Sequence, residues 1–167
     1  MALITLIRHG KAEMPSINSS DFDRKLTSRG RKNSIAMGQF IVEQKLLPEL
    51  VIVSPSCRTR ETYELASQAW PSNLPVSFVS SLYEASAETL LMSILENGEK
   101  LTSVMVIGHN PSLATLLNYM TRKYFSEFNS MIFPTCSIAA VGFVPPAIRD
   151  ISPNSGKLMT FKKVRDL

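Results

Sequence analysis

The first residues of the chain constrain its fold most strongly. The segment Ala2–Ile7 is almost entirely apolar and rich in branched side chains, and Arg8, His9 and Gly10 follow it directly. An apolar run of this length, without glycine, proline or charge, is typical of a buried strand. In an open α/β sheet, ligands bind at the carboxyl ends of the strands. We therefore expect Arg8 and His9 at the ligand-binding edge of a sheet, although a solvated histidine on a capping loop also fits the local pattern.

Short apolar runs alternate with helical patterns along most of the chain. Three more runs have the composition of buried strands, at residues 50–53, 76–79 and 104–107. Three predicted helices begin after the N-cap residues Thr27, Ser86 and Asn110. A fourth predicted helix has Arg58 near its start and continues to about Trp70. Two segments nearer the carboxyl terminus, 137–143 and 157–164, are predicted to be strands that join the edge of the sheet in antiparallel orientation. This order of elements indicates the α/β class.

Length and composition are those of one folded domain. The chain has 167 residues, of which 44% are hydrophobic and 19% charged. No change in composition divides it, and a chain of this size buries a sizeable core. We therefore expect a single domain over residues 1–167.

Charge and cysteine content narrow the classes of ligand. The net charge of +4 suits an anionic substrate, but the basic residues form no helix face with stacking aromatics, so no nucleic acid is predicted. Cys57 and Cys136 lack the paired spacing of a zinc site, so neither a metal nor another cofactor is expected. No signal-type or transmembrane-length apolar run is present, which predicts a cytoplasmic protein without membrane contact.

Two more strand ends carry residues suited to anions. Arg58 follows the second strand at the start of a helix, where backbone N–H groups and a guanidinium converge on an anion. His109 follows the fourth strand, in the place that His9 has after the first. The alternatives are an exposed Arg58 paired with Glu61 and a structural His109. Because both histidines of the chain occupy matching places, we favour a shared function.

A carboxylate and a long loop are weaker candidates. Glu84 precedes the helix at 87–96 on a loop, where most carboxylates are only solvated. The polar segment Lys11–Lys25 is long enough to border a binding site, or else to be a surface excursion.

The residues after the strands also match the motifs of a known family. In chain order these are Arg8-His9-Gly10, Leu26-Thr27 with Gly30, Ser54-Pro55 with Arg58-Thr59, Leu82-Tyr83-Glu84 and Gly108-His109-Asn110-Pro111. Together they resemble the histidine phosphatase superfamily over about residues 2–143. The amino-acid sequences of the last two motifs are similar to those of the SixA-type branch, the protein phosphohistidine phosphatases. The resemblance implies a three-layer α/β/α sandwich with a mostly parallel central sheet and an antiparallel edge.

The resemblance assigns roles to five of these residues. It implies that His9 is the phosphorylated nucleophile and that Arg8, Arg58 and His109 bind the phosphoryl group. The last motif adds Asn110 to the substrate-binding residues.

Two further positions are implied less directly. Glu84 lies where many members of the family have a general acid. Members similar to phosphoglycerate mutase have an asparagine a few residues beyond Arg-His-Gly, and here Asn18 is the nearest substitute.

The implied reaction is metal-independent phosphoryl transfer to His9, followed by hydrolysis. Arginines and histidines stabilise the charge that spreads over the phosphoryl oxygens. No long insertion between the motifs builds a lid over a small molecule, so the expected partner is a protein bearing phosphohistidine, such as a phosphotransfer domain or phosphocarrier. A small-molecule phosphomonoesterase is the main alternative, and a non-catalytic phosphoprotein-binding module is another.

Two other phosphate-handling classes are excluded. A cysteine phosphatase needs an arginine six positions after its cysteine, but Tyr63 follows Cys57 at that spacing and Gly142 follows Cys136. A P-loop nucleotide hydrolase needs a glycine-rich loop ending in Lys-Ser or Lys-Thr, which the sequence lacks.

Overall fold

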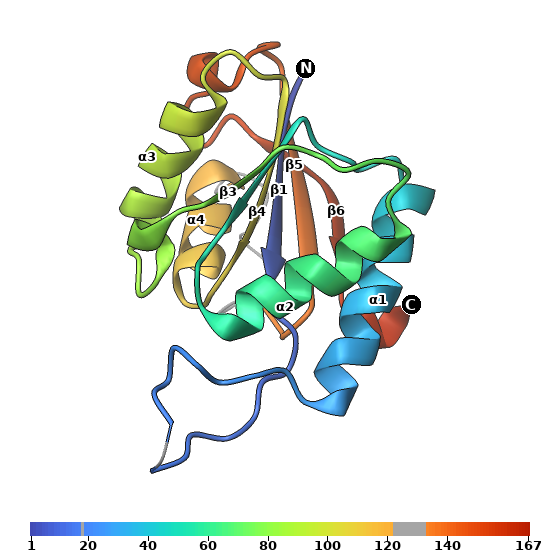
Figure 1. Cartoon of the computed structure of the whole chain (residues 1–167). Helices are drawn as coiled ribbons and strands as arrows, with labels where there is room; N and C mark the ends of the chain where they lie inside the picture. The colour runs from blue at the N-terminus through green and yellow to red at the C-terminus, as the bar shows by residue number, and fades with distance from the viewer. Residues whose placement is uncertain (18, 122–132) are drawn as a thin grey trace.

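A six-stranded mixed sheet lies at the centre of the computed structural model, which describes residues 1–17, 19–121 and 133–167 (Figure 1). Its strands lie in the order β3 (Val76–Phe78), β2 (Leu50–Val53), β4 (Ser103–Gly108), β1 (Ala2–Arg8), β5 (Ile138–Phe143) and β6 (Lys157–Lys162). The first four strands are parallel, whereas β5 is antiparallel to β1 and β6 is antiparallel to β5. The predicted mostly parallel sheet with an antiparallel edge is confirmed.

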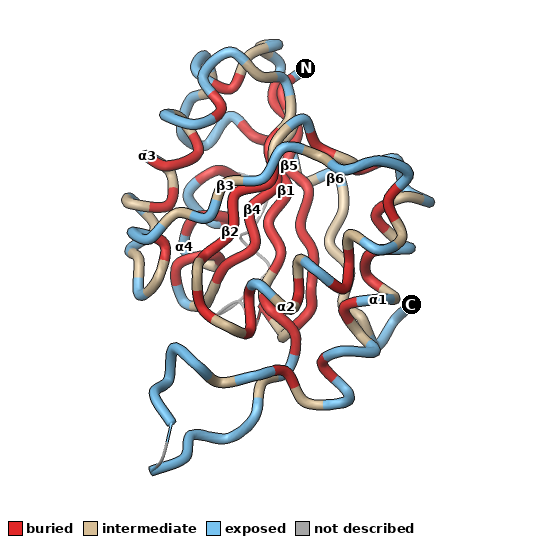
Figure 2. The backbone as a smooth tube through the Cα atoms, viewed as in Figure 1, coloured by how far each residue is buried: buried red, intermediate tan, exposed pale blue. Residues whose placement is uncertain are grey.

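Helices cover both faces of this sheet. In the described part of the chain they are α1 (Ser28–Glu43), α2 (Cys57–Ala66), α3 (Ala87–Gly98) and α4 (Ser112–Thr121), with short 3₁₀ turns at Ser67–Ala69, Ser80–Leu82, Ile148–Asp150 and Val164–Asp166. Because side chains alternate along a strand, Ile7 belongs to the buried cluster that holds Met37 of α1 on one face, and Leu6 belongs to the cluster that holds Ile94 of α3 on the other. The central strands are buried between the two helical layers (Figure 2), which makes the predicted three-layer α/β/α sandwich.

Local sequence patterns predicted most boundaries of the helices and strands correctly. The Thr27 side chain accepts a hydrogen bond from the Gly30 N–H and caps α1, and Ser86 caps α3 through the Thr89 N–H. The helix expected to reach Trp70 ends earlier because the chain tightens into a 3₁₀ turn after Ala66.

One predicted cap is wrong. Asn110 does not cap α4, which begins at Ser112, because its side-chain oxygen accepts no hydrogen bond among the described residues. The Asn110 amide donates instead to the carbonyl of Phe133 at 2.9 Å. Phe133 itself is fully buried. Asn18 lies outside the described residues. No helix in the described residues is long and apolar enough to span a bilayer.

Candidate active site

The carboxyl ends of three neighbouring parallel strands form the candidate active site, at the lower end of β1 in Figure 1. The N–H of His9, just after β1, donates to the carbonyl of Gly108 in β4 at 3.1 Å. The N–H of Ser54, just after β2, donates to the carbonyl of Ile107 in β4 at 3.0 Å. The sheet therefore brings together Arg8, His9, Arg58 and His109.

His9 is 9% exposed, and one of its ring nitrogens is fixed. Nδ1 lies 2.7 Å from the carbonyl oxygen of Gly10. A carbonyl only accepts, so Nδ1 carries the proton and Nε2 keeps its lone pair. The pKa of His9 is lowered to about 3, chiefly by burial and also by the neighbouring groups His109, Arg58 and Arg8, and the hydrogen bond to the Gly10 carbonyl opposes this shift. The ring is therefore neutral near pH 7.

The backbone around His9 is tied to two other elements. The N–H of Gly10 donates to Thr62 Oγ1 of α2 at 2.9 Å, and the N–H of Cys136 donates to the His9 carbonyl at 3.0 Å. Gly30 of α1 also approaches closely, because a Cβ built on it would lie 2.2 Å from the carbonyl of Lys11. These contacts hold the segment that carries His9 from both sides, which explains the place of Gly30 in the motif.

His109 lies beside His9, with 5.2 Å between the ring centroids. Its Nε2 is 2.8 Å from the hydroxyl of Ser54, and its buried Nδ1 has no partner among the described residues. Burial lowers the pKa of His109 to about 4, and the charges of Arg58 and Arg8 act in the same direction, whereas Asp21 raises it. His109 is therefore also neutral near pH 7, with one ring nitrogen unpartnered.

Arg8 and Asn110 share one backbone acceptor. Nη1 of Arg8 donates to the Phe133 carbonyl at 2.8 Å, and the Asn110 amide donates to the same oxygen at 2.9 Å. Among the described residues, Nε of Arg8 and Oδ1 of Asn110 are buried without partners. Burial lowers the pKa of Arg8, and the charge of Arg58 adds to this effect. The Arg8 charge is thus half-buried near a second cation, with no carboxylate against it in the described structure.

Arg58 is more deeply buried than Arg8, and a carboxylate neutralises it. Its Nη1 donates to the Asp21 carbonyl at 2.6 Å, and its Nη2 donates to the Asp21 carboxylate at 2.9 Å. The alternative of a surface pair with Glu61 is wrong, because Glu61 bonds instead to Arg31 and to the N–H of Leu26. The long loop forms this contact, so it borders the site.

Sequence reasoning missed Asp21. Its carboxylate also accepts from the hydroxyl of Tyr83 at 2.9 Å and from Arg24 at 2.7 Å. The bond to Arg24 is the largest of the effects that hold the pKa of Asp21 well below its usual range. Asp21 is 37 residues from Arg58 and 62 from Tyr83 along the chain, so no local pattern points to it.

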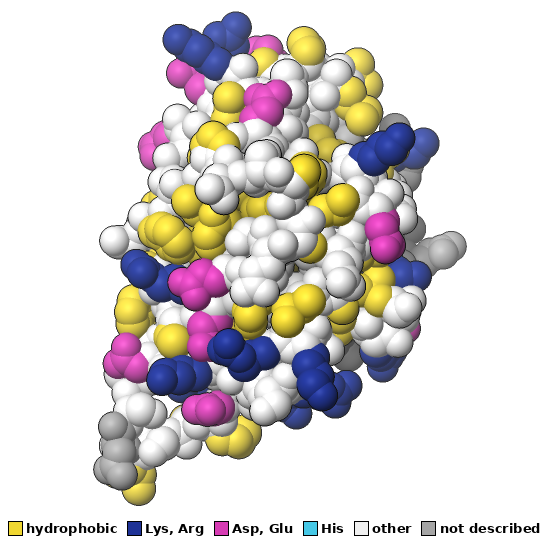
Figure 3. All heavy atoms as spheres, turned by 45° about the vertical axis from the view of Figure 1, so that its right-hand side comes forward, with side chains coloured by type: hydrophobic (Ala, Val, Ile, Leu, Met, Phe, Trp, Pro, Cys, Tyr) yellow, Lys and Arg dark blue, Asp and Glu magenta, His cyan; other side chains and the backbone are white. Residues whose placement is uncertain are grey.

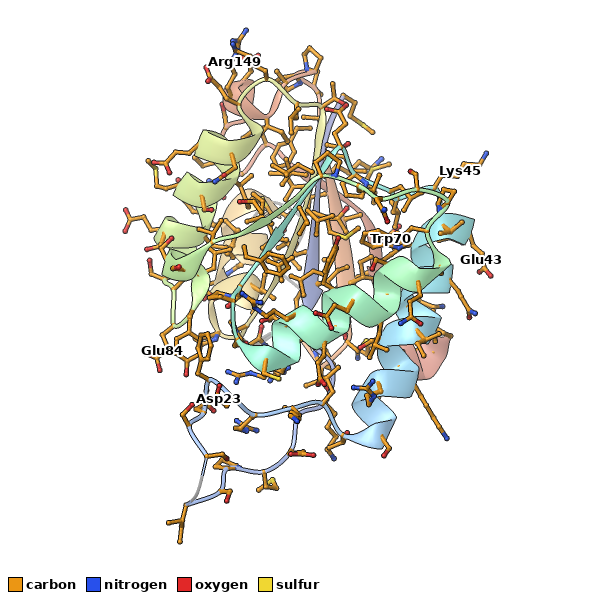
Figure 4. The ribbon with its side chains drawn as sticks, viewed as in Figure 1. Asp23, Glu43, Lys45, Trp70, Glu84 and Arg149 are labelled. Atoms are coloured by element: carbon orange, nitrogen blue, oxygen red, sulfur yellow. The ribbon has the colours of Figure 1, made fainter. Side chains whose placement is uncertain are left out.

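Glu84 stands apart from this group. It is exposed, with φ at 54°, and its side chain points outward from the loop (Figure 4). Its neighbour Tyr83 faces the site instead, because the Tyr83 ring lies 5.9 Å from the His109 ring in an edge-on contact. The general-acid role of Glu84 stays a prediction.

The comparisons with known proteins agree with this architecture. The sheet order and helical layers are those of the α/β proteins with a histidine phosphatase fold. The chain belongs to the histidine phosphatase superfamily (branch 1), whose family model matches residues 4–90.

Particular relatives place it in the SixA-type branch. It is 30% identical over 142 residues to the phosphohistidine phosphatase SixA of Escherichia coli (strain K12), a match that covers 83% of each chain. An uncharacterized protein of Mycobacterium tuberculosis is 28% identical over 160 residues, covering 93% of this chain and 98% of the relative. The structure of the protein histidine phosphatase SixA complexed with tungstate shares the fold, with a TM-score of 0.79, 22% identity and coverage of 98% of this chain and 97% of that one.

Proposed function

We propose that this protein is a phosphatase that removes the phosphoryl group from phosphohistidine on another protein, through a covalent phosphohistidine on His9. The bond from His9 Nδ1 to the Gly10 carbonyl carries the proposal, because it leaves Nε2 unprotonated and able to attack phosphorus. The low pKa of His9 supports it, since the ring stays neutral at physiological pH.

In the first step, Nε2 of His9 attacks phosphorus in line with the leaving nitrogen. The new N–P bond forms as the N–P bond of the substrate breaks. A substrate ring protonated on its other nitrogen leaves as neutral imidazole and needs no further proton. The phosphorylated His9 ring is then positively charged, and the Gly10 carbonyl stabilises its Nδ1–H.

The surrounding side chains bind the phosphoryl oxygens. Arg8 and Arg58 supply permanently charged guanidinium groups, and Nε of Arg8, which has no partner among the described residues, is a further donor. His109 donates a hydrogen bond to an oxygen that becomes more negative in the transition state. Asn110 fixes the same backbone carbonyl as Arg8 and so helps to position it. Asp21 holds the Arg58 guanidinium in place.

In the second step, water attacks the phosphorus on His9. The O–P bond forms, the bond to Nε2 breaks, and the proton of the water leaves with phosphate or to solvent. Because the protein supplies the positive charge, we expect turnover in the presence of a chelator. Glu84 acts as proton donor only when the leaving group is an alcohol or phenol, which departs poorly without a proton.

The relatives support this assignment. The E. coli relative is named as a phosphohistidine phosphatase, and a SixA structure holds tungstate, an oxyanion.

A rapid-quench experiment tests the proposal. The protein is mixed with a histidine-containing phosphotransfer domain carrying labelled phosphohistidine, quenched in base, and mapped by mass spectrometry. We expect transient label on His9 and release of inorganic phosphate. Label on another residue contradicts the proposal. A much higher kcat/KM for aryl phosphate than for the phosphorylated domain supports a small-molecule phosphomonoesterase instead.

A further inference from the structure

A basic groove of about 440 Å³ opens beside the candidate active site. Its lining residues come from four segments of the chain: Lys11, Arg29, Asn33, Pro134, Thr135, Lys163, Val164 and Arg165. Figure 3 turns the side that carries α1 toward the reader and shows several Lys and Arg side chains on its lower part, with Asp and Glu side chains among those toward the left. None of the residues given a role in phosphoryl transfer lines this groove, so it is a separate feature.

The groove is continuous with the segments that hold the nucleophile. Lys11 lies two residues after His9, and its carbonyl accepts hydrogen bonds from the Thr27 N–H at 2.9 Å and the Thr27 hydroxyl at 3.0 Å. Pro134 follows Phe133, whose carbonyl binds Arg8 at 2.8 Å. A ligand in the groove therefore contacts segments that adjoin His9 and the Arg8 partner Phe133 along the chain.

The charge of the groove is almost uncompensated. Four of its eight lining residues are cations and none is a carboxylate. In the described part of the chain, Lys11, Arg29 and Lys163 have no ion-pair partner, and Arg165 has only a loose contact of 3.7 Å with exposed Asp166. Like charges gathered this way repel one another, so an anionic ligand gains from all of them.

A hollow on the Arg58 side of the site has the opposite character. It is lined by Asp23, Glu61 and Glu64, with Arg60 as its one cation. A protein bound over His9 therefore meets positive charge on one side and mostly negative charge on the other. Such an arrangement orients a partner whose own surface is acidic beside the reacting group.

The groove suits carboxylates on a protein surface better than nucleic acid. Its lining contains no Phe, Tyr or Trp on which a base stacks. Lys11, Arg29 and Arg165 are exposed, which favours a solvated contact between side chains over a closed site for one small anion.

We propose that the basic groove binds an acidic surface segment of the phosphohistidine-bearing substrate protein, next to its phosphohistidine. This inference rests on the proposed function. It assigns substrate recognition to residues that take no part in the chemistry.

A matched pair of charge-reversal variants tests the groove. The groove variant is Arg29→Glu with Lys163→Glu. The control is Lys100→Glu with Lys157→Glu, which makes the same charge change at two exposed positions near the amino ends of β4 and β6. The graded variant Arg29→Gln with Lys163→Gln tests whether loss of charge alone has an intermediate effect.

Turnover is measured on an acidic phosphorylated phosphotransfer domain and on phosphoimidazole. We expect the groove variant to lose about ten-fold or more in kcat/KM on the domain and to lose most of its salt dependence, because the contact is electrostatic. Its turnover of phosphoimidazole, and both activities of the control, should stay within about two-fold of wild type. Equal losses on both substrates, or equal losses in groove and control variants, overturn the proposal.

Binding gives a readout that does not depend on turnover. A fluorescent oligoglutamate peptide should bind the wild type and the control but not the groove variant. If the wild type fails to hydrolyse the phosphorylated domain, the proposed function is wrong, whereas failure to bind the peptide overturns only the groove. Groove-dependent binding of single-stranded DNA or phosphatidylglycerol vesicles, without peptide binding, also overturns it.

Discussion

The two histidines at the ends of β1 and β4 have the same place in the fold but different hydrogen bonds. His9 is fixed through Nδ1 by a backbone carbonyl, and His109 is fixed through Nε2 by the hydroxyl of Ser54. A carbonyl can only accept, whereas a hydroxyl donates or accepts. One strand end therefore presents a ring with a defined lone pair, and its neighbour presents a ring that can act as a donor.

The comparison separates the proposed nucleophile, His9, from its proposed electrostatic partner, His109. The rings are 5.2 Å apart, and burial lowers the pKa of both. Only His9 has the free Nε2 that attack on phosphorus requires. Both histidines belong to the candidate site because each follows the carboxyl end of a strand. The atom that each ring contacts distinguishes their proposed roles.

The largest expected effect comes from removing the proposed nucleophile. His9→Ala should lower kcat by about 10⁴-fold or more, because no other group in the proposed cycle forms the covalent intermediate. Steady-state phosphate release from a phosphorylated domain measures the loss. Retained hydrolysis in this variant would assign the chemistry to a different residue.

His109→Ala should have a smaller effect of a different kind. Loss of one transition-state donor costs about 10² to 10³-fold in kcat. Labelled phosphate should still map to His9 after a quench, only more slowly. If His109→Ala is as inactive as His9→Ala and no label appears on His9, the two rings do not have the separate roles of nucleophile and hydrogen-bond donor.

Glu84 lies after β3, whereas His9 and His109 lie after β1 and β4. A substitution of Glu84 therefore tests whether this further strand end contributes a proton donor. Glu84→Gln should lower kcat on an aryl phosphate by about ten-fold or more, and on a phosphohistidine protein by less than about two-fold, because the imidazole leaves readily once protonated. Equal losses on the two substrates would count against a general-acid role.

The lowered pKa values also predict how stability depends on pH. Both histidines are neutral in the folded protein down to about pH 4, whereas in the unfolded chain they gain a proton below about pH 6.5. Their contribution to stability is therefore fully present above pH 6.5 and is lost as the pH falls toward 4. The free energy of unfolding should fall by up to about 1.4 kcal/mol per pH unit for each histidine.

Denaturant unfolding at several pH values measures this slope. His109→Gln should have a shallower slope between pH 6.5 and about 4, because one of the two titrating rings is gone. If the free energy of unfolding of this variant depends on pH as steeply as that of wild type, His109 is already charged in the folded state.

A smaller effect than that of His109→Ala is expected for Ser54→Ala, which leaves Nε2 of His109 without its partner. Losing one such hydrogen bond should lower kcat by about five-fold. In the His109→Ala background the same change should have no further effect, because Ser54 acts through that ring. Additive losses in this double-mutant cycle would show a separate function for Ser54.

Local pattern was a good guide to elements and to the nearest site residues. Arg8, His9, Arg58 and His109 were predicted together because each follows an apolar strand, and parallel strands end at one edge of a sheet. The pattern misled where a side chain had a distant partner. Asn110 looks like a helix cap but bonds to Phe133, 23 residues away along the chain.

By itself, the sequence determined the alternation of strands and helices, the caps Thr27 and Ser86, and the side chains delivered to the ligand-binding edge. These depend on periodicity and neighbouring residues. Only the tertiary structure decided which ring nitrogen of each histidine is bonded, and how Asp21 neutralises Arg58 while Arg8 has no carboxylate partner in the described part of the chain. It also decided that four segments bring their cations to one groove. Those features depend on contacts between residues far apart in the chain, which form only when the sheet and its covering helices are assembled.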